Sequence, residues 1–178
     1  MENNGIVAED RMVSHPKHYE KGQGHIECID LLSLLCHGYK DIFANEVGQS
    51  KYLYRAGTKA EEGYTLKQKT IQDLKKIRWY MSDFKLRAKT YMEMNNLSFG
   101  PVVYYNNDKE YIPLEVSILK YEFTFDKPEI IKEDIAEIIG IIYRFDSIQS
   151  VDKVIALLDK LIEKVMSLDS NLVAQLDY

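Results

Sequence analysis

Residues 66–94 read LKQKTIQDLKKIRWYMSDFKLRAKTYMEM and carry the clearest secondary-structure signal in the chain. Apolar side chains recur there at steps of three, four and three residues, at Leu74, Ile77, Met81 and Phe84. This spacing places them on one face of an α-helix, because helix positions advance by about 100° per residue. The pattern therefore predicts one long helix over 66–94 with a single buried stripe.

Helices are also predicted before and after this stretch. Apolar residues recur at helical spacing over 26–36, and a second helix is expected over 41–56, where Gly57 suits the left-handed conformation that ends helices. Pro128 precedes a helix predicted over 129–144.

The last predicted helix follows Ser150. Its apolar residues repeat with heptad spacing, at Val151, Val154, Leu158, Leu161, Val165 and Leu168. Two or so heptads are too few for a free coiled coil, so the stripe is expected to pack inside the molecule or against a second copy. On this ground we expect a homo-oligomer.

The segment between the two helical parts has a different composition. Residues 99–125, FGPVVYYNNDKEYIPLEVSILKYEFTF, are rich in β-branched and aromatic residues, and NND is a turn signal. The sequence therefore predicts a β-hairpin here. The expected fold is mainly α: a compact helical N-terminal domain over 1–96, and a C-terminal part over 97–178 with one β-hairpin and two helices.

The composition is that of an ordinary globular protein. The chain has 178 residues, of which 46% are hydrophobic and 29% charged, with a net charge of -5. This charge gives no general attraction for nucleic acid or anionic membranes. No apolar run approaches the ~20 residues of a membrane span, and no secretory signal is present. The expectation is a cytoplasmic protein with neither a membrane nor a nucleic acid as partner.

Polar residues gather at the predicted second helix. Lys51 and Arg55 lie four residues apart on one helix face, and Lys59 follows the Gly57 end. Cations that converge in this way can hold a phosphate, Arg by two parallel hydrogen bonds and Lys as a point charge. The alternative is a solvent-exposed face whose cations interact with the helix dipole.

The long helix carries polar and aromatic residues off its buried stripe. Trp79 points almost opposite the stripe, beside Lys76 and Asp83, while Asp73 and Tyr80 lie on the flank. Either the C-terminal half covers Trp79, or Trp79 forms a surface for stacking or for a partner.

Three of the four histidines lie in HPKHYEKGQGHIECID, residues 15–30. The spacing of His15, His18 and His25 is a weak metal-ligand pattern. Glu27 and Asp30 share one helix face and can hold Mg²⁺ or act as a general base, or they are simply exposed near a helix N-terminus. A P-loop motif is absent from the sequence.

Four short motifs carry a resemblance to a known family. HPKHY, GHIECIDLL, KYLYRAGTK and DLKKIRWYM occur in an order and spacing similar to the SaV-like domain found in many tailed-phage proteins. The resemblance covers residues from about 14 to 84, and the loop AEEGYTLKQKT is an insertion-like departure from it. The family includes a phage kinase of deoxynucleoside monophosphates that lacks a P-loop, and a member implicated in sensitivity to an abortive-infection system.

The resemblance implies a phage nucleotide-binding protein in the infected bacterial cytoplasm, with ATP as the phosphoryl donor of a monophosphate kinase. Its motif positions, with the exposed residues above, give the expected catalytic residues His15, His18 and Arg55; the nucleotide-binding residues Tyr19, Lys51, Tyr52, Lys59, Asp73, Lys76, Trp79 and Tyr80; and Glu27 and Asp30 as ligands if Mg²⁺ is used. A His15–Tyr19 loop would cover the basic helix, with Trp79 or Tyr19 stacked on the base.

Two other functions stay open. One is a non-enzymatic protein that binds a host or defence protein through exposed aromatic residues and the heptad-like tail. The other is an all-helical nucleotide pyrophosphohydrolase, which needs two acidic helix motifs for Mg²⁺. Beyond Glu27 and Asp30, the sequence offers only Glu61, Glu62 and Asp73 to complete such a site.

Overall fold

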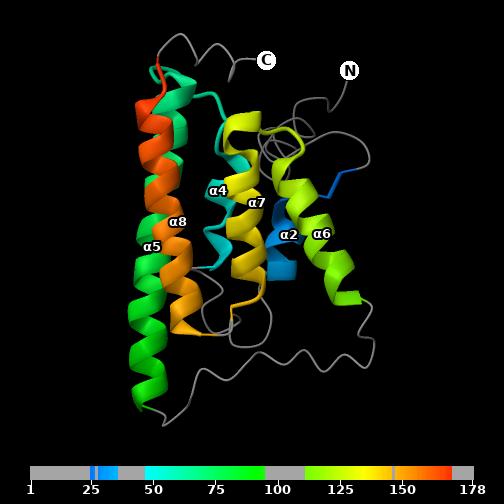
Figure 1. Ribbon diagram of the computed structural model, residues 1–178, viewed down its shortest axis with the longest axis vertical. Coiled ribbons are helices and arrows are strands. Elements are labelled where there is room, and N and C mark those ends of the chain that lie inside the picture. Colours follow the sequence, from blue (N-terminus) through cyan, green and yellow to red (C-terminus); the bar gives the residue numbers. More distant parts are fainter. Residues whose placement is uncertain (1–24, 27, 36–46, 95–110, 146, 170–178) are drawn as a thin grey trace, which may run out of the picture.

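The computed structural model describes residues 25–26, 28–35, 47–94, 111–145 and 147–169. This part of the chain is helical and contains no strand. Its helices are α2 (Cys28–Leu35), α4 (Lys51–Arg55), α5 (Leu66–Met94), α6 (Tyr111–Thr124), α7 (Glu129–Tyr143) and α8 (Ile148–Ser167) (Figure 1). The mainly α fold class is therefore confirmed. None of these helices has the length and apolar composition needed to cross a membrane.

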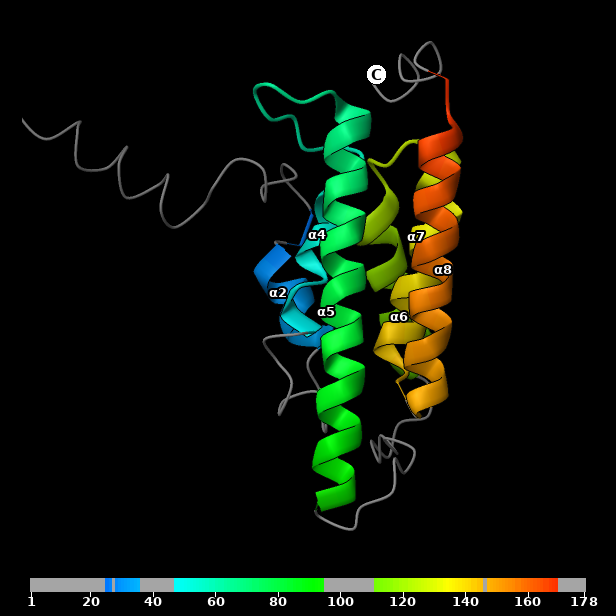
Figure 2. The same cartoon turned by 90° about the vertical axis from the view of Figure 1, so that its left-hand side faces the viewer.

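The longest helix, α5, packs along α8, and α7 packs against both α8 and α6. Figure 2 shows α2 and α4 on one side of α5 and α8 on the other. The predicted bounds of α5 are correct, and its stripe residues are all buried: Leu74, Ile77, Met81 and Phe84.

The heptad-like stripe of α8 is covered within the chain. Its five residues from Val151 to Val165 are buried, and Leu168 is half-buried. Of the two expectations for this stripe, packing inside the molecule is confirmed. A homo-oligomer stays a prediction that this stripe no longer supports.

The predicted second helix is interrupted. A turn at residues 49 and 50 separates the helical residues 47–48 from α4, which begins at Lys51. The rest of the predicted helix, residues 41–46, lies outside the described residues.

The predicted β-hairpin is wrong where the structure describes it. Residues 111–124 form α6, in which Val116, Leu119 and Phe123 are buried at steps of three and four residues. Residues 97–110 lie outside the described part. Strand preference depends on what a side chain packs against, and here Val116 and Phe123 pack on the buried face of a helix. Pro113 is tolerated because it lies in the first helical turn, where the backbone N–H has no helical partner.

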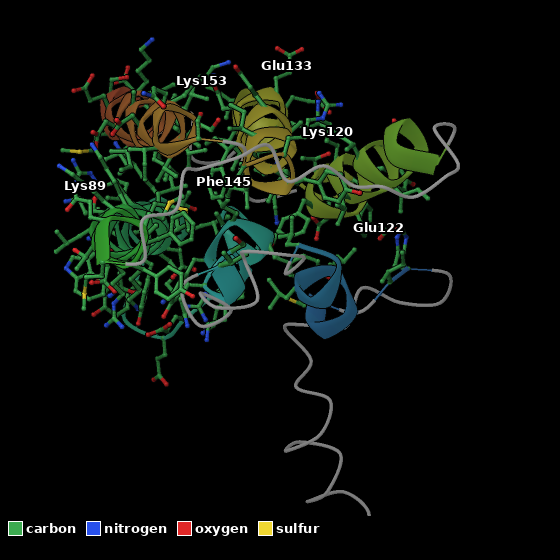
Figure 3. The ribbon with its side chains drawn as sticks, turned by 90° about the horizontal axis from the view of Figure 1, so that it is seen from below. Lys89, Lys120, Glu122, Glu133, Phe145 and Lys153 are labelled. Atoms are coloured by element: carbon green, nitrogen blue, oxygen red, sulfur yellow. The ribbon has the colours of Figure 1, made fainter. Side chains whose placement is uncertain are left out.

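Side chains from both sides of residue 96 form one continuous core. The Tyr54 ring lies edge-on to Phe123 at 5.5 Å between centroids, and Phe84 stacks on Phe145 at 5.4 Å. Viewed along the helices, Phe145 lies in the middle of the bundle (Figure 3). The division of the chain at residue 96 stays a prediction, and the two parts share their core.

The end of α4 fits closely against the start of α7. Gly57 has a φ of 79° and donates its N–H to the Thr70 hydroxyl at 3.1 Å. A Cβ at this position would lie 2.7 Å from Ile131 Cδ1 and 3.0 Å from Pro128 Cδ. The buried ammonium of Lys127 donates to the Tyr54 carbonyl oxygen. Glycine is therefore required here both by the backbone and by the neighbouring helix.

Gly57→Ala should destabilise the protein by about 2–4 kcal/mol, since it combines a left-handed alanine with overpacking. Gly63→Ala is the matched control, because Gly63 has nearly the same φ, 82°, but no atom within 4 Å of its Cβ position. The control should lose about 1–2 kcal/mol in urea denaturation. Equal losses for the two variants would show that the contact with α7 is unimportant.

Candidate functional site

The sequence-predicted residues Arg55 and Asp73 form a buried ion pair between α4 and α5. Arg55 Nε donates to Asp73 Oδ2 at 2.8 Å, and Nη2 donates to Oδ1 at 2.9 Å. The Asp73 carboxylate is fully buried and the Arg55 side chain is only 9% exposed. This two-point geometry fixes the orientation of both side chains, because the planar guanidinium matches the carboxylate.

A second buried cation, Lys69, belongs to the same network. Its ammonium lies 3.5 Å from Asp73 Oδ1 and 2.7 Å from Glu61 Oε2, and it donates to Gln72 Oε1 at 2.7 Å. The hydrogen bond from Lys69 lowers the pKa of Glu61, with help from Lys59 at 3.5 Å. Sequence reasoning missed Lys69, although its place four residues before Asp73 on one helix was a usable signal.

Three cations converge on the ring of Tyr52. The distances to the ring centroid are 4.5 Å from Arg55 Cζ, 5.4 Å from Lys76 Nζ and 5.6 Å from Lys51 Nζ. Cations within about 6 Å of an aromatic ring are attracted by its quadrupole. The structure thus brings Lys51, Arg55 and Lys76 together, while their contact with any ligand stays a prediction.

Two further rings extend from Tyr52 toward solvent. Tyr80 stacks on Tyr52 with 6.1 Å between centroids, and Trp79 lies edge-on to Tyr80 at 5.0 Å. The Trp79 side chain is 60% exposed, so the expectation that the C-terminal half covers it is wrong. An exposed ring beside a group of cations is suited to stacking on a flat ligand.

We call this group the Tyr52 cluster; its members are Lys51, Tyr52, Arg55, Lys59, Glu61, Lys69, Asp73, Lys76, Trp79 and Tyr80. Five cations and two carboxylates leave an excess of three positive charges, in a chain whose net charge is -5. Burial lowers the pKa of Lys76, and the like charge of Lys69 lowers it further, against the opposing effect of Asp73. Because the cluster has more cations than carboxylates, it keeps positive charge that a bound anion can neutralise.

The histidine-rich segment contributes little to the described structure. His15, His18, Tyr19 and Glu27 lie outside the described residues, as does the side chain of Asp30. His25 lies instead against the end of α6: its Nδ1 is 3.1 Å from Glu122 Oε2 of that helix, and its ring stacks at 3.8 Å on Phe125, just after the helix. Among the described residues, no group of three or more His, Cys, Asp or Glu side chains could hold a metal ion.

Comparison with known proteins gives one family match, over less than half of the chain, and no activity. Residues 13–82 match DUF3310, a protein family of unknown function. No curated protein and no solved structure matches the chain. The matched region contains the whole Tyr52 cluster, whereas α6, α7 and α8 lie beyond it.

Asp73→Asn should destabilise the fold by about 3–5 kcal/mol, because it removes the buried carboxylate that pairs with Arg55 and lies near the Lys69 ammonium. Asp83→Asn on the same helix is the control, since Asp83 makes only a surface pair with Arg87. That variant should change stability by less than about 1 kcal/mol in chemical denaturation. A small loss for Asp73→Asn would contradict a structural role for the buried pair.

Proposed function

We propose that the Tyr52 cluster binds the phosphate group of a nucleotide, and that the chain is a deoxynucleoside monophosphate kinase with ATP as donor. The observation that carries the binding proposal is the convergence of Lys51, Arg55 and Lys76 on the Tyr52 ring, with a local excess of positive charge. The kinase reaction rests on the resemblance of the four sequence motifs.

The cations of the cluster divide into two groups. Arg55 and Lys69 are buried and bound to carboxylates: the pair of Arg55 with Asp73 holds α4 against α5, and the pair of Lys69 with Glu61 holds the loop before α5. Lys51 and Lys76 are half-buried and are the cations proposed to contact phosphate oxygens. Lys59, paired with Glu61, would lie at the edge of the phosphate site.

Base recognition is assigned to the exposed ring of Trp79. Stacking of a base on an aromatic side chain contributes about 1–3 kcal/mol and tolerates different bases. Tyr80 would hold the Trp79 ring in place through their edge-on contact. Tyr19 remains a second proposed stacking residue.

The phosphoryl transfer would rest on positioning and charge stabilisation. An oxygen of the monophosphate attacks the γ-phosphorus of ATP, the bond to ADP breaks, and a deoxynucleoside diphosphate forms. Lys51 and Lys76 would stabilise the negative charge on the transferred group. His15 or His18 is the proposed proton acceptor, and Glu27 and Asp30 are the proposed ligands if Mg²⁺ takes part.

A second function, binding of a host or defence protein, is favoured by one observation. Trp79 and Leu86 are 60% and 65% exposed on α5, seven residues and thus two helical turns apart. The pyrophosphohydrolase alternative ranks last, because Asp73 and Glu61 are already occupied by Arg55, Lys69 and Lys59.

Lys51→Gln and Lys76→Gln should each weaken nucleotide binding about 10-fold or more, since a hydrogen bond to a charged group contributes about 1.5–3 kcal/mol. Isothermal titration of deoxynucleoside monophosphates measures the affinity. Lys89→Gln is the control, because Lys89 is an exposed lysine of α5 outside the cluster. Absence of binding by the unaltered protein at millimolar nucleotide would end the binding proposal.

Product analysis by mass spectrometry, after incubation with ATP and a deoxynucleoside monophosphate, separates the three functions. Deoxynucleoside diphosphate with ADP is the expected result. Monophosphate released from a triphosphate would support the pyrophosphohydrolase. No turnover, together with a host protein retained in a pull-down that Trp79→Ala abolishes, would support the binding module.

The affinity for a monophosphate should fall as pH rises through the pKa of Lys76, because only the charged ammonium binds the anion. Since this pKa lies below the ordinary value of 10.5, the fall should begin at a lower pH than for an ordinary lysine. Lys76→Arg keeps its charge and should hold the affinity to higher pH. Titrations between about pH 7.5 and 10, where the phosphate itself is ionised, measure the effect. Identical pH profiles for the two proteins would contradict a phosphate contact by Lys76.

A further inference from the structure

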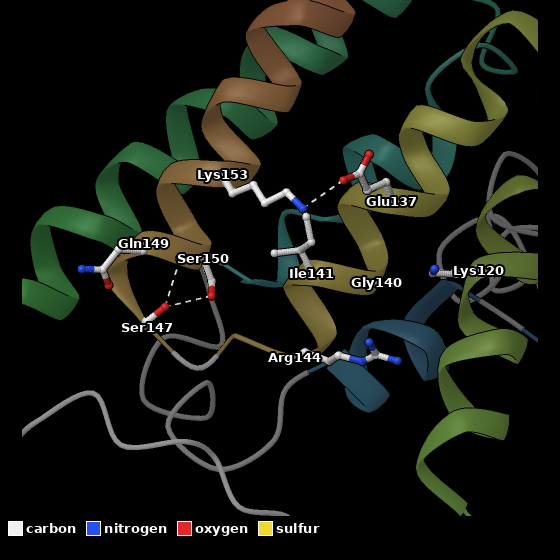
Figure 4. Close-up of a pocket in the computed structure, with 9 residues that line it drawn as sticks. All are labelled: Lys120, Glu137, Gly140, Ile141, Arg144, Ser147, Gln149, Ser150 and Lys153. Carbon is white, nitrogen blue, oxygen red and sulfur yellow. Dashed lines mark hydrogen bonds and ion pairs between the residues drawn. The ribbon is translucent and has the colours of Figure 1, made fainter.

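A groove of about 580 Å³ lies between α6, α7 and α8 (Figure 4). Small-molecule sites in proteins commonly have volumes of about 300–1,000 Å³. None of the residues that line it belongs to α4 or α5, so the groove is separate from the Tyr52 cluster. Its polar lining includes the side chains of Lys120, Glu137, Arg144, Ser147, Ser150 and Lys153.

Three cations from different parts of the chain line the groove. Lys120 comes from α6, Arg144 directly follows α7, and Lys153 comes from α8. Lys153 Nζ pairs with Glu137 Oε1 at 3.1 Å. Among the described residues, the ammonium of Lys120 and the guanidinium of Arg144 have no ion-pair partner. The groove therefore carries an excess of two positive charges.

Gly140 makes room for the Lys120 side chain. A Cβ on Gly140 would lie 2.6 Å from Lys120 Cε and 3.2 Å from Nζ. The lysine of α6 thus crosses the surface of α7 at the one point where no side chain obstructs it, and its ammonium reaches the groove. An alanine at this position would displace the charged end of a flexible side chain without disturbing the backbone.

The first turn of α8 adds polar groups to the lining of the groove. Ser147 caps the helix by accepting the Ser150 N–H at 3.2 Å, and the two hydroxyl oxygens lie 3.0 Å apart (Figure 4). The positive end of the helix dipole reinforces the field of the three cations.

We propose that this groove binds a small molecule that carries two or more phosphate groups, and that it does so through the phosphates. The Arg144 guanidinium can bind a phosphate through two parallel hydrogen bonds, and Lys120 and Lys153 supply point charges. No aromatic residue is among those that line the groove, so a base would have no ring to stack on. A nucleoside triphosphate and inorganic tripolyphosphate share this chemistry, and the groove should bind both with similar affinity.

Isothermal titration with inorganic tripolyphosphate tests the proposal. The protein used is the full chain with Lys51→Gln and Lys76→Gln, so that binding at the Tyr52 cluster does not contribute. Arg144→Gln and Gly140→Ala, each added to this background, should weaken binding at least 10-fold. Glu137→Gln removes the carboxylate that competes for Lys153 and should tighten binding several-fold. ATP should bind within about threefold of tripolyphosphate.

Lys89→Gln is the matched control, because it removes one positive charge from α5, away from the groove (Figure 3). It should leave the affinity unchanged within about twofold. Gly140→Ala should keep its melting temperature, because alanine is a better helix former than glycine. If Gly140→Ala unfolds, the affinity of Arg144→Gln tests the proposal by itself, since Arg144 is exposed and its substitution should not affect folding. Undetectable binding at millimolar tripolyphosphate, equal weakening by Lys89→Gln and Arg144→Gln, or much tighter binding of ATP would each overturn the proposal.

Discussion

The buried ion pair between Arg55 and Asp73 is the constraint on which the site depends. A fully buried carboxylate is tolerated only with good partners, and Asp73 has two, Arg55 from α4 and Lys69 from its own helix. The pair holds α4 against α5 and places the guanidinium over the Tyr52 ring. Lys51 and Lys76 then share that ring, and their charge is not neutralised within the cluster. The Arg55–Asp73 ion pair and the proposed phosphate contacts of Lys51 and Lys76 thus depend on each other through the Tyr52 ring.

The C-terminal helices complete the fold of the region that matches DUF3310. Gly57, inside the matched region, lies against Pro128 and Ile131 beyond it, and Tyr54 packs on Phe123. The last turn of α4, and with it Arg55, is therefore held from both sides. The same helices form the second cationic groove, whose charges come from residues outside the matched region. The chain thus has two separate cationic regions at its surface, supported by one shared core.

The sequence predicted the structure correctly where the spacing of residues along one helix determines which side chains share a face. The steps of three and four residues through Leu74 and Ile77 predicted α5, and the four-residue spacing of Lys51 and Arg55 predicted their shared face. The prediction failed for α6, because β-branched and aromatic residues suit a buried helix face as well as a strand. Lys69 was missed although Asp73 follows it by four residues on the same helix. The groove was missed because its three cations come from distant segments. Such contacts are set by packing, which local pattern does not reveal.

The central claim is that the Tyr52 cluster, held by the Arg55–Asp73 pair, binds a nucleotide phosphate. The most direct test is an amide NMR titration of the unaltered protein with a deoxynucleoside monophosphate. The account predicts saturable shifts at residues 51–55 and 72–80, with smaller changes along α6, α7 and α8. Shifts confined to other helices, or an unchanged spectrum at millimolar nucleotide, would contradict it.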